Sequence, residues 1–223
     1  MKFKTLCARC NSHLLGQLYD VELLKFVDGF QHHLRGITPT TPVAPIVHVR
    51  ANLHAVARSV IGHLLAAHSI QDTQQFRENI GASESLRQYF LDPEAPFPDD
   101  WRLLCWPYFH ERQVILRHTV WKDIASDHAG TYGHLLKFSP FAFWLINDAP
   151  ENLHIGGQDI TPAGNDNTQL SSVYFPMFRV PNALYPELPT NNTFLFNSGN
   201  QSSIARPYRN PNYTKKSPGK SKP

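Results

Sequence analysis

Apolar residues recur with helical spacing through the N-terminal part of the chain. Between residues 17 and 34 they follow one another at steps of three and four positions, which places them on one face of a helix. These residues are Leu18, Val21, Leu24, Val27, Phe30 and Leu34. A further helical segment is expected between about residues 73 and 91, interrupted near Gly81, with Ser83 as the N-cap of its second half.

The clearest amphipathic helix is expected from residue 53 to about residue 68. Asn52 precedes it and is a suitable N-cap, because its side chain can accept a hydrogen bond from a backbone N–H of the first turn. His54 and Arg58 are four positions apart and fall on the polar side of this pattern. With the two segments above, the pattern predicts about three helices.

After residue 101 the pattern changes to short runs of aromatic and β-branched residues, separated by turn-like segments. Four such runs predict an antiparallel meander: residues 102–110, 113–121, 132–138 and 141–147. Further strands are expected at residues 46–50 and 172–180. Beyond Pro181 the chain is rich in Pro, Asn and Ser, and its last eighteen residues are expected to be disordered.

Helices followed by an antiparallel sheet indicate an α+β fold. The chain divides into a cysteine-containing segment at residues 1–16, a helical region at 17–91, a β-rich region at 92–205 and a disordered tail at 206–223. Alternatively, residues 17–205 form one domain in which the helices pack on the sheet.

Composition places this protein among folded proteins outside the membrane. The 223 residues are 41% hydrophobic and 17% charged, which favours a packed core over global disorder. No apolar run is long enough to span a membrane, and the N-terminus has no apolar signal segment. Three cysteines do not form a disulfide framework. We therefore expect a cytoplasmic protein without a membrane partner.

The positive charge of the chain is concentrated at its C-terminal end. The formal net charge is +3, yet residues 206–223, the tail, carry six cations and no acid, so the preceding 205 residues carry a net −3. The cations are Arg206, Arg209, Lys215, Lys216, Lys220 and Lys222. Such a segment is either a nucleic-acid-binding arm or a solvated extension that confers solubility.

Cys7 and Cys10 form the one motif in the chain that points to a specific chemistry. Two cysteines separated by two residues can place both thiolates on one metal ion, for which zinc is the usual occupant. Alternatively, both are reduced cysteines without a ligand. A redox dithiol is less favoured, because no thioredoxin-type βαβ pattern surrounds the pair.

The residues around this pair resemble the end of an HNH endonuclease motif. In that family a ββα-metal unit closes with a Leu-Cys-x-x-Cys-Asn/His segment that leads into a helix. Here Leu6, Cys7, Cys10 and Asn11 match it, and Gly16 follows five residues later. The resemblance covers residues 4–16, and it implies a bacterial or phage protein that associates with DNA.

The family would use a divalent ion, Mg²⁺ or Mn²⁺, to bind the scissile phosphate while a histidine activates water. Its first cysteine pair and its acidic-His dipeptide precede the segment that this chain matches, and only six residues precede Cys7. We therefore expect an HNH endonuclease-related protein that lacks the N-terminal half of its metal motif and is incomplete or inactive as a nuclease. Cys7 and Cys10 would hold structural zinc.

Other residues offer further candidate ligands and a candidate base. Cys105 and His110 form a Cys-x₄-His pair that would complete a four-ligand zinc site with the first two cysteines, although a place in the core, where free cysteines are usually found, is favoured for Cys105. His128 follows Asp127 and copies the acidic-His dipeptide in a different order, which makes it a candidate general base in a hydrolase.

Two function classes are excluded and one alternative stays open. The chain contains no phosphate-binding glycine loop and no Gly-x-Ser-x-Gly nucleophile elbow. The alternative to an HNH-related protein is a non-enzymatic bacterial or phage interaction protein in which the cysteines are incidental.

Overall fold

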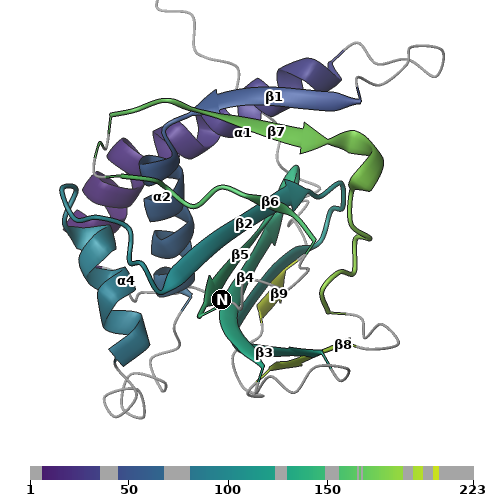
Figure 1. The fold of residues 1–223 in the computed structure, drawn as a ribbon. Coiled ribbons are helices and arrows are strands. Elements are labelled where there is room, and N and C mark those ends of the chain that lie inside the picture. Colours follow the sequence, from purple (N-terminus) through teal and green to yellow (C-terminus); the bar gives the residue numbers. More distant parts are fainter. Residues whose placement is uncertain are drawn as a thin grey trace, which may run out of the picture.

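The structure is a computed structural model that describes residues 7–35, 45–67, 81–123, 130–148, 156–164, 166, 168–187, 193–197 and 203–205. Its architecture is α+β, as the sequence pattern predicts, with most helices preceding the antiparallel sheets (Figure 1). Among the residues described, no helix combines the length and the hydrophobicity needed to cross a membrane.

The first helical region is longer than expected. A π-helical segment, η1 (Arg9–Tyr19), runs directly into α1 (Asp20–Leu34), and α2 (Leu53–Ala66) and α4 (Gly81–Leu91) follow. The predicted cap of α2 is confirmed, because the Asn52 side chain accepts a hydrogen bond from Ala55 N at 3.0 Å. The cap at Ser83 is wrong, since α4 already begins at Gly81. Residues 73–80 of the expected third segment lie outside the described residues.

The larger sheet holds the four predicted strands and three more. Its strand order is β6-β2-β5-β4-β3-β8, and β9 pairs with β3 beside β8. The bounds are β2 (Trp101–Pro107), β3 (Gln113–Asp123), β4 (Thr131–Phe138), β5 (Phe141–Asn147), β6 (Gln158–Asp159), β8 (Thr193–Asn197) and β9 (Ser203–Ala205). Only β3, β4 and β5 form a meander, because β2 pairs with β5 rather than with β3.

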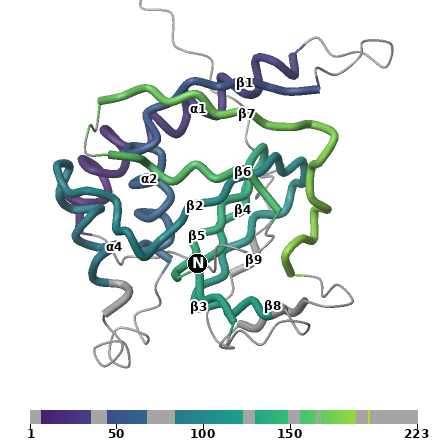
Figure 2. Tube along the Cα trace, viewed as in Figure 1, coloured from purple at the N-terminus to yellow at the C-terminus, as the bar shows by residue number. Residues whose placement is uncertain are grey.

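A separate two-stranded sheet joins β1 (Ile46–Ala51) to β7 (Ser171–Pro176). Both strands were expected, but β7 ends at Pro176, and a 3-10 turn, η3 (Met177–Arg179), follows it. Figure 2 shows the two strands side by side over α1, although they are far apart in the sequence. We call this pair the β1–β7 ribbon.

Both faces of the larger sheet are covered. On one face, Leu103, Cys105, Leu136, Phe141 and Phe143 share a core with the helices and with the β1–β7 ribbon. On the other face, a second cluster forms around Trp106, Leu135 and Trp144, and Ala183, Tyr185 and Leu195 pack against it. Successive residues of a strand therefore pack into different clusters, one on each face of the sheet.

The buried face of α1 is only partly the predicted one, since Phe30 is buried and Val27 and Leu34 pack against the core, as expected. Leu23, Phe26 and Phe30 are buried, and the rings of Phe26 and Phe30 each lie 4.7 Å from the Phe141 ring of the sheet. Leu18, Val21 and Leu24, at the N-terminal end of the predicted apolar face, form an exposed apolar row instead. Tertiary packing therefore covers only part of the predicted face.

The predicted polar side of α2 is also buried. This helix packs against η1, α1, α4 and β4. Arg58 Nε donates to Tyr89 O at 3.0 Å, and its Nη2 donates to the carbonyls of Pro93 at 2.9 Å and Ala95 at 2.8 Å. A cation at the C-terminal end of α4 is favourable, because the helix presents unpaired carbonyls there. His54 is likewise buried, and its Nδ1 lies 2.9 Å from Tyr89 Oη.

Candidate functional site

The Cys7 and Cys10 thiols lie together at the exposed start of η1. Their sulfur atoms are hydrogen-bonded at 3.1 Å, and Cys10 N donates to Cys7 Sγ at 3.3 Å. The helical turn after Cys7 produces this proximity, since residues three apart lie on one face, and Asn11 N closes the turn by donating to Cys7 O at 2.9 Å. In a tetrahedral zinc site with Zn–S bonds of about 2.3 Å, two sulfurs lie about 3.8 Å apart. An increase of about 0.7 Å in the distance between the two sulfur atoms would therefore give this pair the spacing of two zinc ligands.

The two thiols differ in acidity. The pKa of Cys7 is lowered by the hydrogen bond with the Cys10 side chain and by the Cys10 backbone N–H. The pKa of Cys10 is raised by the same contact with Cys7 and by partial burial against the core. Cys7 is therefore the more readily formed thiolate, which is the form that binds metal and reacts with electrophiles.

The further zinc candidates lie elsewhere. Cys105 is buried in the middle of β2, opposite Phe143 of β5, and its pKa is raised well above its ordinary value by burial. His110 is exposed beyond the end of β2, where its Nδ1 accepts a hydrogen bond from Arg112 N at 3.1 Å. Within the described part of the chain, no three His, Cys, Asp or Glu residues are grouped so that they could hold a metal ion. The structure therefore does not bring the four proposed zinc ligands together.

The remaining candidates fall outside the described residues. His128 lies there, as do all six cations of the tail. His134 is buried on β4, where its ring is stacked on Trp101 with centroids 5.6 Å apart. Its Nδ1 accepts a hydrogen bond from His118 N at 3.2 Å.

A bulge in β3 creates this histidine cluster. The register with β4 shifts between Leu116 and Thr119, and His118 adopts a φ of 53°. The His118 ring is hydrogen-bonded to Tyr132 Oη, and burial raises the pKa of Tyr132 to about 12. The cluster joins β2, β3 and β4, with Trp101 and His134 buried and His118 and Tyr132 half-buried, and its geometry fits a packing role.

The sequence offered no signal for a second polar cluster, formed by Asp20, Ser59 and His63. Asp20 Oδ1 accepts hydrogen bonds from Ser59 Oγ at 2.5 Å and from His63 Nε2 at 3.2 Å. Burial by itself would raise the pKa of Asp20, but these hydrogen bonds lower it below its ordinary value. Because both partners point at the carboxylate, Ser59 has no hydrogen bond to His63 that would activate it as a nucleophile.

An apolar pocket of about 320 Å³ lies beside Asp20 and His63. Among the described residues its walls include Leu23, Leu24, Ile115, Leu136 and Phe138. The cluster of Asp20, Ser59 and His63 therefore links α1 to α2 at the edge of this pocket.

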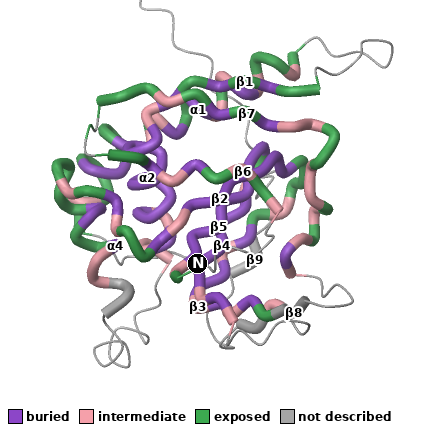
Figure 3. The backbone as a smooth tube through the Cα atoms, viewed as in Figure 1, coloured by how far each residue is buried: buried purple, intermediate pink, exposed green. Residues whose placement is uncertain are grey.

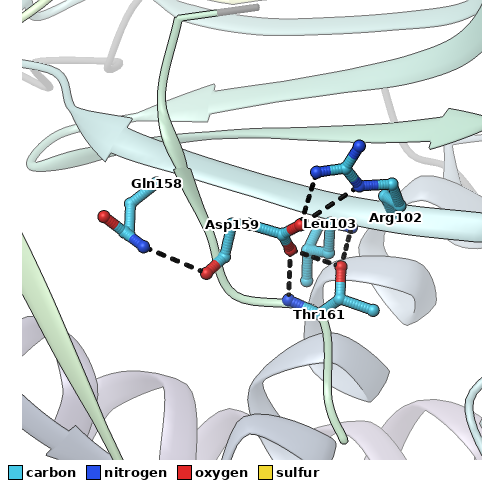
Figure 4. A network of polar contacts seen from close by, with 5 residues as sticks. All are labelled: Arg102, Leu103, Gln158, Asp159 and Thr161. Carbon is cyan, nitrogen blue, oxygen red and sulfur yellow. Dashed lines mark hydrogen bonds and ion pairs between the residues drawn. The ribbon is translucent and has the colours of Figure 1, made fainter. Parts of the chain in front are cut away.

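Two ion pairs connect strands of the larger sheet to later segments of the chain. Asp159 accepts hydrogen bonds from Arg102 Nη2 at 2.7 Å and from Thr161 Oγ1 at 2.6 Å, while Leu103 N donates to Thr161 Oγ1 (Figure 4). The buried Lys137 Nζ of β4 donates to Glu187 Oε2 at 2.6 Å and to the carbonyls of Ala183 and Tyr185. Both pairs connect the sheet to later segments of the chain, which is a structural role.

Comparisons with models of protein families, with curated proteins and with solved structures gave no match for this chain.

Proposed function

We propose that this chain belongs to a nucleic-acid-associated protein related to the HNH endonucleases, in which Cys7 and Cys10 supply two ligands of a structural zinc ion. The observation that carries this proposal is the 3.1 Å separation of the two sulfur atoms at an exposed helical start. The other two ligands would come from residues outside the described ones or from a second copy of the chain, because zinc in structural sites takes four.

As a nuclease, such a protein would use Mg²⁺ or Mn²⁺ at the scissile phosphate. Among the described residues, no histidine forms a group with Cys7 and Cys10 that could hold a metal ion. We expect this chain to be inactive as a nuclease. Association with DNA through the tail is the activity that remains, because six cations without an acid bind phosphates through counterion release.

Metal analysis of the purified chain tests the zinc proposal. The chain is purified under reducing conditions with zinc supplied, beside a Cys7→Ser, Cys10→Ser double variant and a Cys105→Ala control. We expect zinc in the unaltered chain and in the control, and its loss in the double variant. Absence of zinc from the unaltered chain, or its retention in the double variant, would contradict the proposal.

Assays of DNA binding and DNA cleavage test the proposed association with DNA and the expected lack of nuclease activity. We expect the chain to bind duplex DNA with a steep salt dependence and to leave plasmid DNA intact with Mg²⁺ or Mn²⁺. A variant with all six tail cations changed to Gln should lose most of the salt dependence. If DNA binding and its salt dependence survive, the tail is not the binding arm. Plasmid nicking would contradict the expected inactivity.

A non-enzymatic interaction protein is the second candidate, and the exposed row of Leu18, Val21 and Leu24 favours it. An exposed apolar row on a helix suits a protein partner. An unchanged melting temperature and an unchanged metal content in the double cysteine variant would support this candidate over the first.

A further inference from the structure

The outward face of the β1–β7 ribbon carries side chains that the fold does not use. Along β1, Ile46, His48 and Arg50 are exposed, while the alternate residues are buried against the core. On β7, Ser172 and Tyr174 are exposed in the same way. Figure 3 shows this alternation of buried and exposed positions on both strands. The ribbon therefore presents one face to solvent over its full length.

Strand pairing builds a stacked pair of aromatic rings in the middle of this face. The register places His48 opposite Tyr174, and their rings are stacked with centroids 4.8 Å apart and planes 17° apart. Tyr174 nevertheless stays 54% exposed. The His48 ring thus covers one face of the Tyr174 ring, and more than half of the Tyr174 side chain stays exposed to solvent.

A second aromatic side chain stands at the end of the ribbon. Met177 N donates to Pro45 O at 2.9 Å, which holds η3 against the start of β1. Phe178 of η3 is 68% exposed, and the guanidinium carbon of Arg179 lies 5.5 Å from the centre of its ring. The contact of Arg179 with this ring is a favourable cation–π interaction, and it places a cation and an exposed aromatic ring side by side.

The charge of this surface is positive, although residues 1–205 carry a net −3. Residues 46–51 and 171–181 contain Arg50, Arg179 and His48, and no Asp or Glu. Exposed aromatic rings interleaved with cations match a chemistry in which bases stack on the rings and phosphates meet the cations. Base faces are accessible in a single strand and are covered by neighbouring bases in a duplex.

We propose that the outward face of the β1–β7 ribbon, together with η3, binds single-stranded nucleic acid. Bases stack on Tyr174 and Phe178, and Arg50 and Arg179 contact phosphates. This inference rests on the proposed association with nucleic acid, and it adds a surface within the fold and the form of the partner.

The test uses the full chain with the six tail cations changed to Gln, so that binding by the tail does not mask the ribbon. Fluorescence anisotropy compares labelled oligothymidylate and oligouridylate, each of about fifteen nucleotides, with a duplex of equal length. We expect at least one single strand to bind more tightly than the duplex. The two single strands distinguish DNA from RNA as the partner.

Variants assign the binding to the ribbon. Tyr174→Leu and Phe178→Leu keep an apolar side chain but remove the ring, and each should weaken binding roughly five-fold or more, whereas Tyr174→Phe should not. Arg50→Gln and Arg179→Gln should each lower the slope of log K against log salt by about 0.7. Phe109→Leu and Arg87→Gln remove an exposed ring and an exposed cation elsewhere, and they should leave binding unchanged.

Three results would overturn the inference: no binding of single strands by the tail-neutralised chain, equal binding of single strands and duplex, or equal weakening in the ribbon variants and their controls. Zinc content is measured on the same preparations. If the unaltered chain contains zinc and binds DNA only through its tail, the proposed function stands and the ribbon inference fails. If the ribbon binds single strands in a chain that contains no zinc, the ribbon inference stands and the proposed zinc site fails.

Discussion

His63 Nε2 lies 3.2 Å from Asp20 Oδ1, and this contact joins α2 to the first residue of α1. Ser59 reaches the same oxygen at 2.5 Å from one helical turn earlier. Since a carboxylate can only accept hydrogen bonds, the proton of His63 that faces Asp20 is on Nε2. The two helices are therefore linked by a polar contact beside an otherwise apolar interface.

Replacing Asp20 with Asn should destabilise the protein at neutral pH. The variant loses the charge-assisted hydrogen bonds to Ser59 and His63, so we expect the free energy of unfolding to fall by roughly 1–2 kcal/mol. Urea denaturation at pH 7 measures this change. Glu22→Gln is the matched control, because Glu22 lies on the same helix and, among the described residues, forms its ion pair with the exposed Lys25. An equal loss in both variants would contradict the prediction.

The same carboxylate should make stability depend on pH in acid. The pKa of Asp20 is lowered in the folded protein, so the unfolded chain takes up its proton first as the pH falls. Its contribution is fully present above about pH 4 and is lost as the pH falls through the lower, folded pKa. Unfolding measured from pH 5 downward should show a smaller loss of stability in Asp20→Asn than in the unaltered chain. Identical pH dependence would contradict this origin.

The three cysteines should react with iodoacetamide in a fixed order. Cys7 should react first, because its pKa is lowered by Cys10 and its side chain is exposed. Cys10 should follow, and Cys105 should react only after unfolding, because it is buried. Peptide mass spectrometry over time gives the order. Modification of Cys105 in the native chain, or of Cys10 before Cys7, would contradict it.

Removing the Lys137 amine alone should lower the free energy of unfolding more than removing both charges of its ion pair with Glu187. Lys137→Met leaves Glu187 and the carbonyls of Ala183 and Tyr185 without their donor, and we expect a loss of roughly 2–4 kcal/mol. Adding Glu187→Gln removes the unpaired charge and should recover part of it. Chemical denaturation of both single variants and the double variant gives the coupling free energy. Additive losses would contradict the predicted coupling.

Gly133 should tolerate no side chain. A Cβ atom there would lie 2.4 Å from Leu145 O and 3.3 Å from Ile146 Cα, and both belong to the backbone of the neighbouring strand. Gly133→Ala should therefore destabilise the protein by roughly 1–3 kcal/mol through displacement of β5 from β4. Gly156→Ala is the control, because its Cβ would meet only side-chain atoms at 3.4 Å. Thermal unfolding of both variants gives the comparison, and equal melting temperatures would contradict the prediction.

Of the candidate site, only contacts between residues close together in the sequence could be predicted. The approach of Cys7 and Cys10 follows from a three-residue spacing at a helical start, and the structure contains that approach. The meeting of Asp20 with Ser59 and His63 depends on how α1 crosses α2, and no spacing in the sequence indicates it. The stacking of His48 on Tyr174 likewise depends on the pairing of two strands from distant parts of the chain.

The sequence by itself determined the α+β class, the Asn52 cap and the approximate positions of β1 to β5 and β7, because these depend on alternation and capping within a few residues. Only the tertiary structure decided which apolar residues of α1 are buried. It likewise decided that Arg58 lies in the core and that β2 pairs with β5. In each case the sequence allows several local solutions of similar free energy. Burial against distant segments of the chain selects one of them, since only there is the apolar surface covered and the polar group satisfied.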